Sequence, residues 1–180
     1  MRQAKGSSPL FPTNIWSEMI DPKGYIGSAI ELSTGDFCGE EGHWLSKLIP
    51  QSYFFGKVNL REPCKRHDYM YGVGKTDRDK MVADLYFLCN LLITMIGLDS
   101  ERLKFIVDTL ITKLDKAYSD KVTHRAWMIF WEGIKDEVSE AKRMCWFKKW
   151  LRYNWAKSYY EAVEIFGFDA YWKNKRMAEN

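Results

Sequence analysis

The chain has 180 residues, of which 46% are apolar and 16% aromatic, enough for one domain with a buried core. Its net charge is only +3, but residues 141–157 hold six Lys and Arg and no Asp or Glu, while the other 21 basic and 24 acidic residues give −3. Four cysteines without a CxxC spacing exclude a zinc ribbon and a dense disulfide scaffold. Without an apolar run typical of a signal peptide or a membrane span, we expect synthesis in the cytoplasm. Release by another route, or action at a membrane, stays open.

The N-terminal third is predicted to be irregular. Residues 1–36 are rich in Gly, Pro, Ser and Thr, which favour turns over regular elements. Residues 35–42 are expected to form a tight, glycine-punctuated loop, and residues 47–60 leave room for a short hairpin. The first helix is predicted over about residues 63–71, because Pro63 suits the first turn of a helix and a pair of glycines follows the end.

The rest of the chain is predicted to be helical, so the fold class is mainly α. Thr76 is a suitable N-cap for a second helix, whose apolar positions keep helical spacing to about Ile96. A third helix is predicted over about residues 101–118. Residues 122–160 are long enough for one or two more helices, and a final short turn is expected around Gly167.

Four polar side chains near the first two helices point to a catalytic or binding site. On a helix, His67 and Tyr71 are four residues apart and share a face, whereas Asp68 points about 100° away. On the second helix, Asp84 falls among apolar positions, where an unpaired carboxylate costs several kcal/mol. We therefore predict that His67 and Tyr71 are partners of Asp84, which orients His67. Asp68 is then available for a hard cation.

These residues carry a resemblance to a known family. The run Cys64-x-x-His67-Asp68-x-x-Tyr71 resembles the active-site helix of phospholipases A2. The segment Phe37-Cys38-Gly39-Glu40-Glu41-Gly42 resembles their calcium-binding loop, and Ala83-Asp84-x-x-Phe87 resembles the helix that supplies the supporting aspartate. The three motifs occur in the family's order across residues 37–87. The closing stretch, residues 159–167, resembles small phage- or prophage-borne relatives.

The resemblance implies a calcium-dependent hydrolase that cleaves the sn-2 ester of glycerophospholipids. His67 would be the general base that activates a water, Asp84 would orient it, and Tyr71 would bond to Asp84. Asp68 would bind Ca²⁺, which would polarise the ester carbonyl. The other implied positions are backbone calcium ligands at Phe37, Gly39 and Glu41, and a disulfide between Cys38 and Cys64.

The family fold implies an antiparallel pair of helices, here within a single domain over residues 1–180. Its core would cover about residues 37–118, and a C-terminal helical extension would cover about residues 120–180. Glu41 departs from the family, which usually has a glycine there; if that residue needs a positive φ, the loop must differ. This departure, with the longer gap between Cys38 and Cys64, motivates one alternative, a non-catalytic lipid- or protein-binding member of the fold. A third possibility is a phage-associated protein that acts on a host component, with a possible host protein partner.

The basic segment predicts an amphipathic helix over residues 142–157. Two interpretations stay open for it: an apolar face in the core with a solvated basic face, or an interfacial helix on a phospholipid membrane. Nucleic acid is not expected as a partner, because no base-reading motif accompanies the charge. The apolar side consists of Met144, Trp146, Phe147, Trp150, Leu151 and Trp155. The membrane-facing candidates are Trp146, Lys148, Lys149, Trp150 and Arg152.

Overall fold

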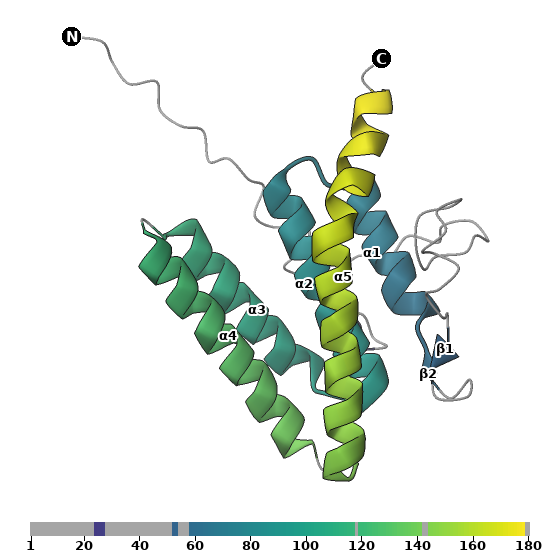
Figure 1. Ribbon diagram of the computed structural model, residues 1–180, viewed down its shortest axis with the longest axis vertical. Helices are drawn as coiled ribbons and strands as arrows, with labels where there is room; N and C mark the ends of the chain where they lie inside the picture. The colour runs from purple at the N-terminus through teal and green to yellow at the C-terminus, as the bar shows by residue number, and fades with distance from the viewer. Residues whose placement is uncertain (1–23, 28–51, 54–57, 118, 142–143, 179–180) are drawn as a thin grey trace.

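The structure is a computed structural model, described for residues 24–27, 52–53, 58–117, 119–141 and 144–178. Within these residues the chain is mainly helical, as predicted, with one short antiparallel strand pair (Figure 1). The elements are β1 (Ser52–Tyr53), β2 (Val58–Asn59), α1 (Arg61–Val73), α2 (Asp77–Ile96), α3 (Ser100–Asp115), α4 (Asp120–Glu140) and α5 (Trp146–Ala178). The hairpin predicted within residues 47–60 corresponds to β1 and β2.

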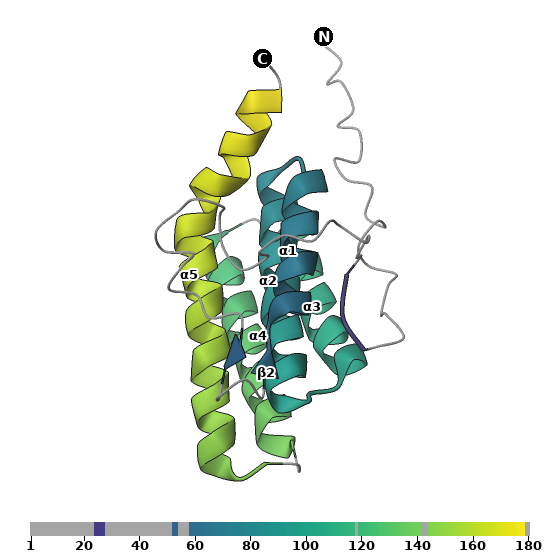
Figure 2. The ribbon, with the colours of Figure 1, turned by 90° about the vertical axis from the view of Figure 1, so that its right-hand side faces the viewer.

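Helices α1 and α2 run antiparallel, joined by a short turn (Figure 2). Helix α1 begins two residues before Pro63, and the Asn59 side chain accepts a hydrogen bond of 2.9 Å from the first backbone N–H, that of Arg61. The start of α2 was predicted correctly: Thr76 and Asp79 form a reciprocal capping box. Gly97 ends α2 in the left-handed conformation, with φ 79°, which glycine adopts at little cost.

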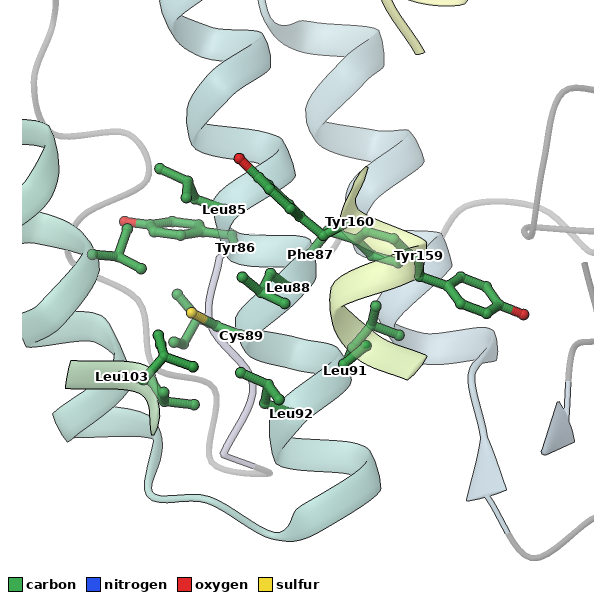
Figure 3. Packing of buried hydrophobic residues seen from close by; sticks show 14 of the residues in the cluster. Leu85, Tyr86, Phe87, Leu88, Cys89, Leu91, Leu92, Leu103, Tyr159 and Tyr160 are labelled. Atoms are coloured by element: carbon green, nitrogen blue, oxygen red, sulfur yellow. The ribbon is translucent and has the colours of Figure 1, made fainter. Parts of the chain in front are cut away.

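Helix α2 is the centre of the core, because it is buried along most of its length. Leu88, Leu91 and Leu92 are fully buried. Figure 3 shows this part of α2 between Leu103 of α3 and Tyr160 of α5. Helices α3 and α4 form a hairpin beside α2, and α5 crosses the α1–α2 pair (Figure 1). The core therefore holds the first two helices in a fixed relation.

Helix α5 differs from the prediction. The final short turn expected around Gly167 is wrong: α5 is one continuous helix of 33 residues. A narrow stripe of α5, including Ala156, Tyr160 and Tyr171, is buried against the rest of the molecule. An internal glycine costs a helix about 1 kcal/mol relative to alanine. Packing along this stripe offsets that cost, so the helix continues through Gly167. Among the described residues, no helix combines the length and the apolar character needed to cross a membrane.

The first turns of α5 also differ from the interpretation that places the apolar face of the basic segment in the core. Trp146, Phe147 and Trp150 are 74%, 59% and 49% exposed, so this part of the apolar face does not lie in the core. Phe147 and Trp150 stack on each other with ring centroids 6.2 Å apart. An exposed aromatic patch, defined by these three residues, therefore lies at the start of α5.

Candidate active site

The centre of the site is the carboxylate of Asp84, on α2, which accepts three hydrogen bonds. Its Oδ1 atom lies 2.9 Å from Nε2 of His67 and 2.6 Å from the hydroxyl of Tyr71, both on α1. Its Oδ2 atom accepts a bond of 2.7 Å from Nζ of Lys80, one turn earlier on α2. The structure thus brings His67, Tyr71 and Asp84 together as the sequence predicted, and adds Lys80, which we did not predict.

Burial determines the electrostatics of this cluster. The side chains of His67, Lys80 and Asp84 are less than a tenth exposed. Desolvation raises the pKa of Asp84, but hydrogen bonds and charges from His67 and Lys80 outweigh it, so the pKa lies below its ordinary value. Desolvation and the Asp84 charge raise the pKa of Tyr71, whose hydroxyl therefore stays protonated and donates. At neutral pH Asp84 is an anion that only accepts hydrogen bonds.

Whenever the ring of His67 is neutral, its hydrogen bond with Asp84 defines the tautomer. Because anionic Asp84 cannot donate, Nε2 carries the proton and Nδ1 presents a lone pair. No group in the described part of the chain forms a hydrogen bond with Nδ1, and the Asp68 carboxylate is 3.9 Å from it. The rings of Tyr71 and Phe87 hold the imidazole, with centroids 4.0 and 4.7 Å away. A fixed imidazole with an open lone pair has the geometry of a general base.

Asp68 lies on the open side of His67, where it meets the requirements of a cation ligand. Desolvation raises the pKa of Asp68 from 3.8 to about 8. The side chain is 41% exposed, so a cation can reach it from solvent. No Lys or Arg among the described residues forms an ion pair with it. A divalent cation would favour the anionic form, and carboxylate oxygen is the ligand type that Ca²⁺ prefers. The donor chemistry of Asp68 therefore fits calcium.

A replacement of Asp68 by Asn is expected to raise the melting temperature at pH 8 in calcium-free buffer, and to change it little near pH 4. An acid whose folded pKa is raised binds its proton more tightly in the folded chain, so its presence lowers stability as pH rises from about 4 to about 8. Thermal unfolding at both pH values measures the difference. Asp136→Asn, at an exposed position of α4, is the control. Equal shifts of the Asp68 variant at both pH values would contradict this assignment.

The other predicted calcium ligands, Phe37, Gly39 and Glu41, lie outside the described residues, as does Cys38. Cys64 forms a disulfide, whereas Cys89 and Cys145 are free. Within the described residues, no three His, Cys, Asp or Glu side chains converge as a metal site. Asp68 is thus the one predicted ligand whose surroundings the structure describes.

Helix α5 closes the site behind Asp84. A Cβ atom added to Gly167 would lie 2.6 Å from the hydroxyl of Tyr71, so the glycine permits α5 to approach this tyrosine. The rings of Tyr71 and Tyr171 meet edge to face at 5.1 Å. The Tyr171 hydroxyl donates to the backbone carbonyl of Thr76 at 2.9 Å, next to the start of α2. Helix α5 therefore fixes Tyr71 and the turn between α1 and α2, a role that the sequence did not predict.

Two of the five membrane-facing candidates are engaged with the protein itself. Arg152 is half-buried and donates through Nη1 to the backbone carbonyl of Met95, at the end of α2. Lys149 donates to the backbone carbonyl of Ser139, at the end of α4, at 2.7 Å. Lys148 and the two tryptophans are exposed. The surface of this region is therefore more aromatic and less basic than the sequence suggested.

Comparisons with protein-family models, with curated proteins and with solved structures found no match for this chain.

Proposed function

We propose that the protein is a calcium-dependent phospholipase A2-like hydrolase that releases the sn-2 fatty acid of glycerophospholipids. The observation that carries the proposal is the different hydrogen bonding of the two ring nitrogens of His67. Its Nε2 atom is held by Asp84, and its Nδ1 atom forms no hydrogen bond with the described residues. Nδ1 is not among the buried atoms that lack a partner in the described part of the chain, so a water molecule can reach it, as the removal of a proton from water requires.

The proposed reaction uses His67 as a proton carrier. Nδ1 of His67 takes one proton from a water molecule while the oxygen of that water forms a bond with the ester carbonyl carbon. Asp84 stabilises the imidazolium that results, and Tyr71 keeps the carboxylate in place. When the tetrahedral intermediate collapses, the ester C–O bond breaks and the imidazolium returns the proton to the leaving alkoxide. The products are a free fatty acid and a lysophospholipid, without a covalent acyl-enzyme.

Asp68 would hold the calcium ion, together with Phe37, Gly39 and Glu41 of the motif. The chemistry that calcium supplies when bound is Lewis-acid polarisation of the ester carbonyl. The closeness of Asp68 to Nδ1 of His67, at 3.9 Å, supports a single site in which water, ester and cation meet. A bound cation would also pair the carboxylate of Asp68, which has no Lys or Arg partner among the described residues.

The experiment that tests the proposal is the release of free fatty acid from mixed anionic vesicles. We expect release in calcium, no release in chelator, and a loss of the calcium-dependent part in Asp68→Asn. Asp136→Asn should release fatty acid as the native protein does. The absence of release in calcium would contradict the proposal and favour a non-catalytic lipid-binding or protein-binding member. Equal release with chelator would contradict the calcium dependence.

A hydrolase of this class must reach a lipid surface, and the aromatic patch at the start of α5 suits that contact. Trp and Phe side chains with nearby Lys fit the headgroup region of a bilayer. Residues 146–160 of α5 carry Lys148, Lys149, Arg152 and Lys157 and no acidic residue, whereas Glu161, Glu164 and Asp169 follow. Attraction to anionic lipid therefore favours the N-terminal part of the helix.

Replacement of both Trp146 and Phe147 by Ser is expected to weaken binding to anionic vesicles at least about tenfold, because each ring loses on the order of 1.5–3 kcal/mol of burial. Ile165 and Phe166 provide a matched control pair on the same helix, 68% and 64% exposed. Their replacement by Ser should leave vesicle binding unchanged. Vesicle flotation measures both, and equal losses from the two pairs would argue against a specific lipid surface.

A further inference from the structure

Lys80 is a buried cation at the candidate site that the phospholipase A2 motif does not include. It is only 6% exposed, and its Nζ atom lies 2.7 Å from Oδ2 of Asp84 and 5.7 Å from the ring centroid of Tyr71. Burial of an unpaired ammonium costs several kcal/mol, so the ion pair with Asp84 is what allows Lys80 to be buried at this position. The site therefore contains a second ion pair member besides His67.

The two oxygens of Asp84 have different partners. Oδ1 accepts from His67 and Tyr71, and Oδ2 accepts from Lys80. Among the described side chains of α5, the groups whose pKa Asp84 influences are Tyr160, Glu164 and Tyr171, none of which is a cation. Among the described groups that face Asp84, Lys80 is thus the basic side chain besides His67, and Glu164 is an acidic one.

We propose that Lys80 is a positioning residue that keeps Asp84 ionised and turned with Oδ1 toward His67, and thereby holds the proton of His67 on Nε2. The inference rests on the proposed function for its catalytic consequence, but its structural content is the tautomer of His67. With Lys80 in place, Asp84 can only accept, so Nε2 must donate and the lone pair of Nδ1 faces Asp68.

Removal of the Lys80 charge reverses this arrangement. The carboxylate then keeps only its hydrogen bonds with His67 and Tyr71, while desolvation, the largest influence on its pKa, favours the protonated form. A protonated Asp84 donates to Nε2 of His67, and the ring proton moves to Nδ1. His67 then presents an N–H group where the reaction needs a lone pair. In a histidine-dependent hydrolase, a wrong tautomer lowers kcat by as much as about 10⁴-fold.

The test reads the tautomer directly, from ¹⁵N chemical shifts of ring-labelled histidine in calcium-free buffer at a pH where the ring is neutral. The chain has three histidines, so the signals are few. We expect the Nε2–H form of His67 in the native protein and in Lys80→Arg. We expect a shift to the Nδ1–H form in Lys80→Met and Lys80→Gln, two neutral variants of different polarity.

Lys104→Met is the matched control. Lys104 and Asp108 form another i, i+4 pair, at 2.5 Å, and Asp108 also accepts from a tyrosine, Tyr86, but from no histidine. This variant should keep the Nε2–H form of His67 and the native rate. In the fatty-acid assay, the neutral Lys80 variants should lose at least about tenfold in kcat with little change in KM.

Two results would overturn the inference about Lys80. One is the Nδ1–H form of His67, or a protonated Asp84, in the native protein, a measurement that needs no variant to fold. The other is an unchanged Nε2–H form in a folded neutral variant of Lys80. A native protein with the expected tautomer but without fatty-acid release would instead contradict the proposed function and leave the role of Lys80 in place.

Discussion

Replacement of Asp84 by Asn is expected to lower the free energy of unfolding by about 3–5 kcal/mol, because it removes one member of a buried ion pair and leaves the other. Lys80 would keep its charge at 6% exposure without a carboxylate. The amide has one acceptor oxygen, whereas three donors converge on this position. At least one donor must therefore face the amide NH₂ group.

Urea denaturation at pH 7 measures this loss. The pKa of Asp84 lies below its ordinary value, so its contribution to stability is fully present above about pH 4 and is lost as pH falls through the folded pKa. Asp108→Asn is the control, since the Lys104–Asp108 pair is more exposed and should be worth about 1 kcal/mol or less.

A second substitution separates the ion pair from the rest of the site. Lys80→Met in the Asp84→Asn background removes the unpaired charge and should restore much of the lost stability, because a buried pair can be replaced by groups of similar volume. Fatty-acid release should not return, since the amide cannot act as the carboxylate does behind His67. A loss below about 1 kcal/mol in Asp84→Asn would show that the pair does not stabilise the fold.

Local patterns predicted the parts of the structure that local physics determines. The start of α2 follows from Thr76 and Asp79, whose side chains satisfy the free N–H groups of the first turn. The contact between α1 and α2 follows from helical spacing: His67 and Tyr71 share a face, and Asp84 is the one acidic residue on the buried side of α2. Polar side chains on buried faces need hydrogen-bond partners, so the contact of His67 and Tyr71 with Asp84 could be predicted from the sequence.

Features that depend on the packing of distant segments could not be predicted from local patterns. Lys80 stands four residues before Asp84, a spacing typical of exposed helix pairs, and nothing local indicates that this pair is buried. Gly167 favours a break in a helix, but the approach of α5 to Tyr71 makes a small residue necessary there. A helical wheel places Trp146 on an apolar side, yet cannot tell whether another element covers that side. These features depend on tertiary packing.

Replacement of His67 by Gln is expected to lower fatty-acid release by about 10²–10⁴-fold, the usual contribution of a general base. Gln is the appropriate substitution because its amide nitrogen can take the place of Nε2, which binds Asp84 at 2.9 Å. The variant then keeps the donor on the Asp84 side and loses only the lone pair of Nδ1. Stability measured by urea denaturation should change far less than in Asp84→Asn.

The exposed residue His124, on α4, provides the matched control, and His124→Gln should leave the rate unchanged. The comparison of His67→Gln with Asp84→Asn also separates two roles within one hydrogen-bonded unit. A general base acts through its lone pair, so the loss of the His67 lone pair lowers the rate without lowering stability. The loss of the buried Asp84 carboxylate lowers both. If His67→Gln releases fatty acid at the native rate, the open Nδ1 atom is not the base, and the His67–Asp84 pair is a structural link between α1 and α2.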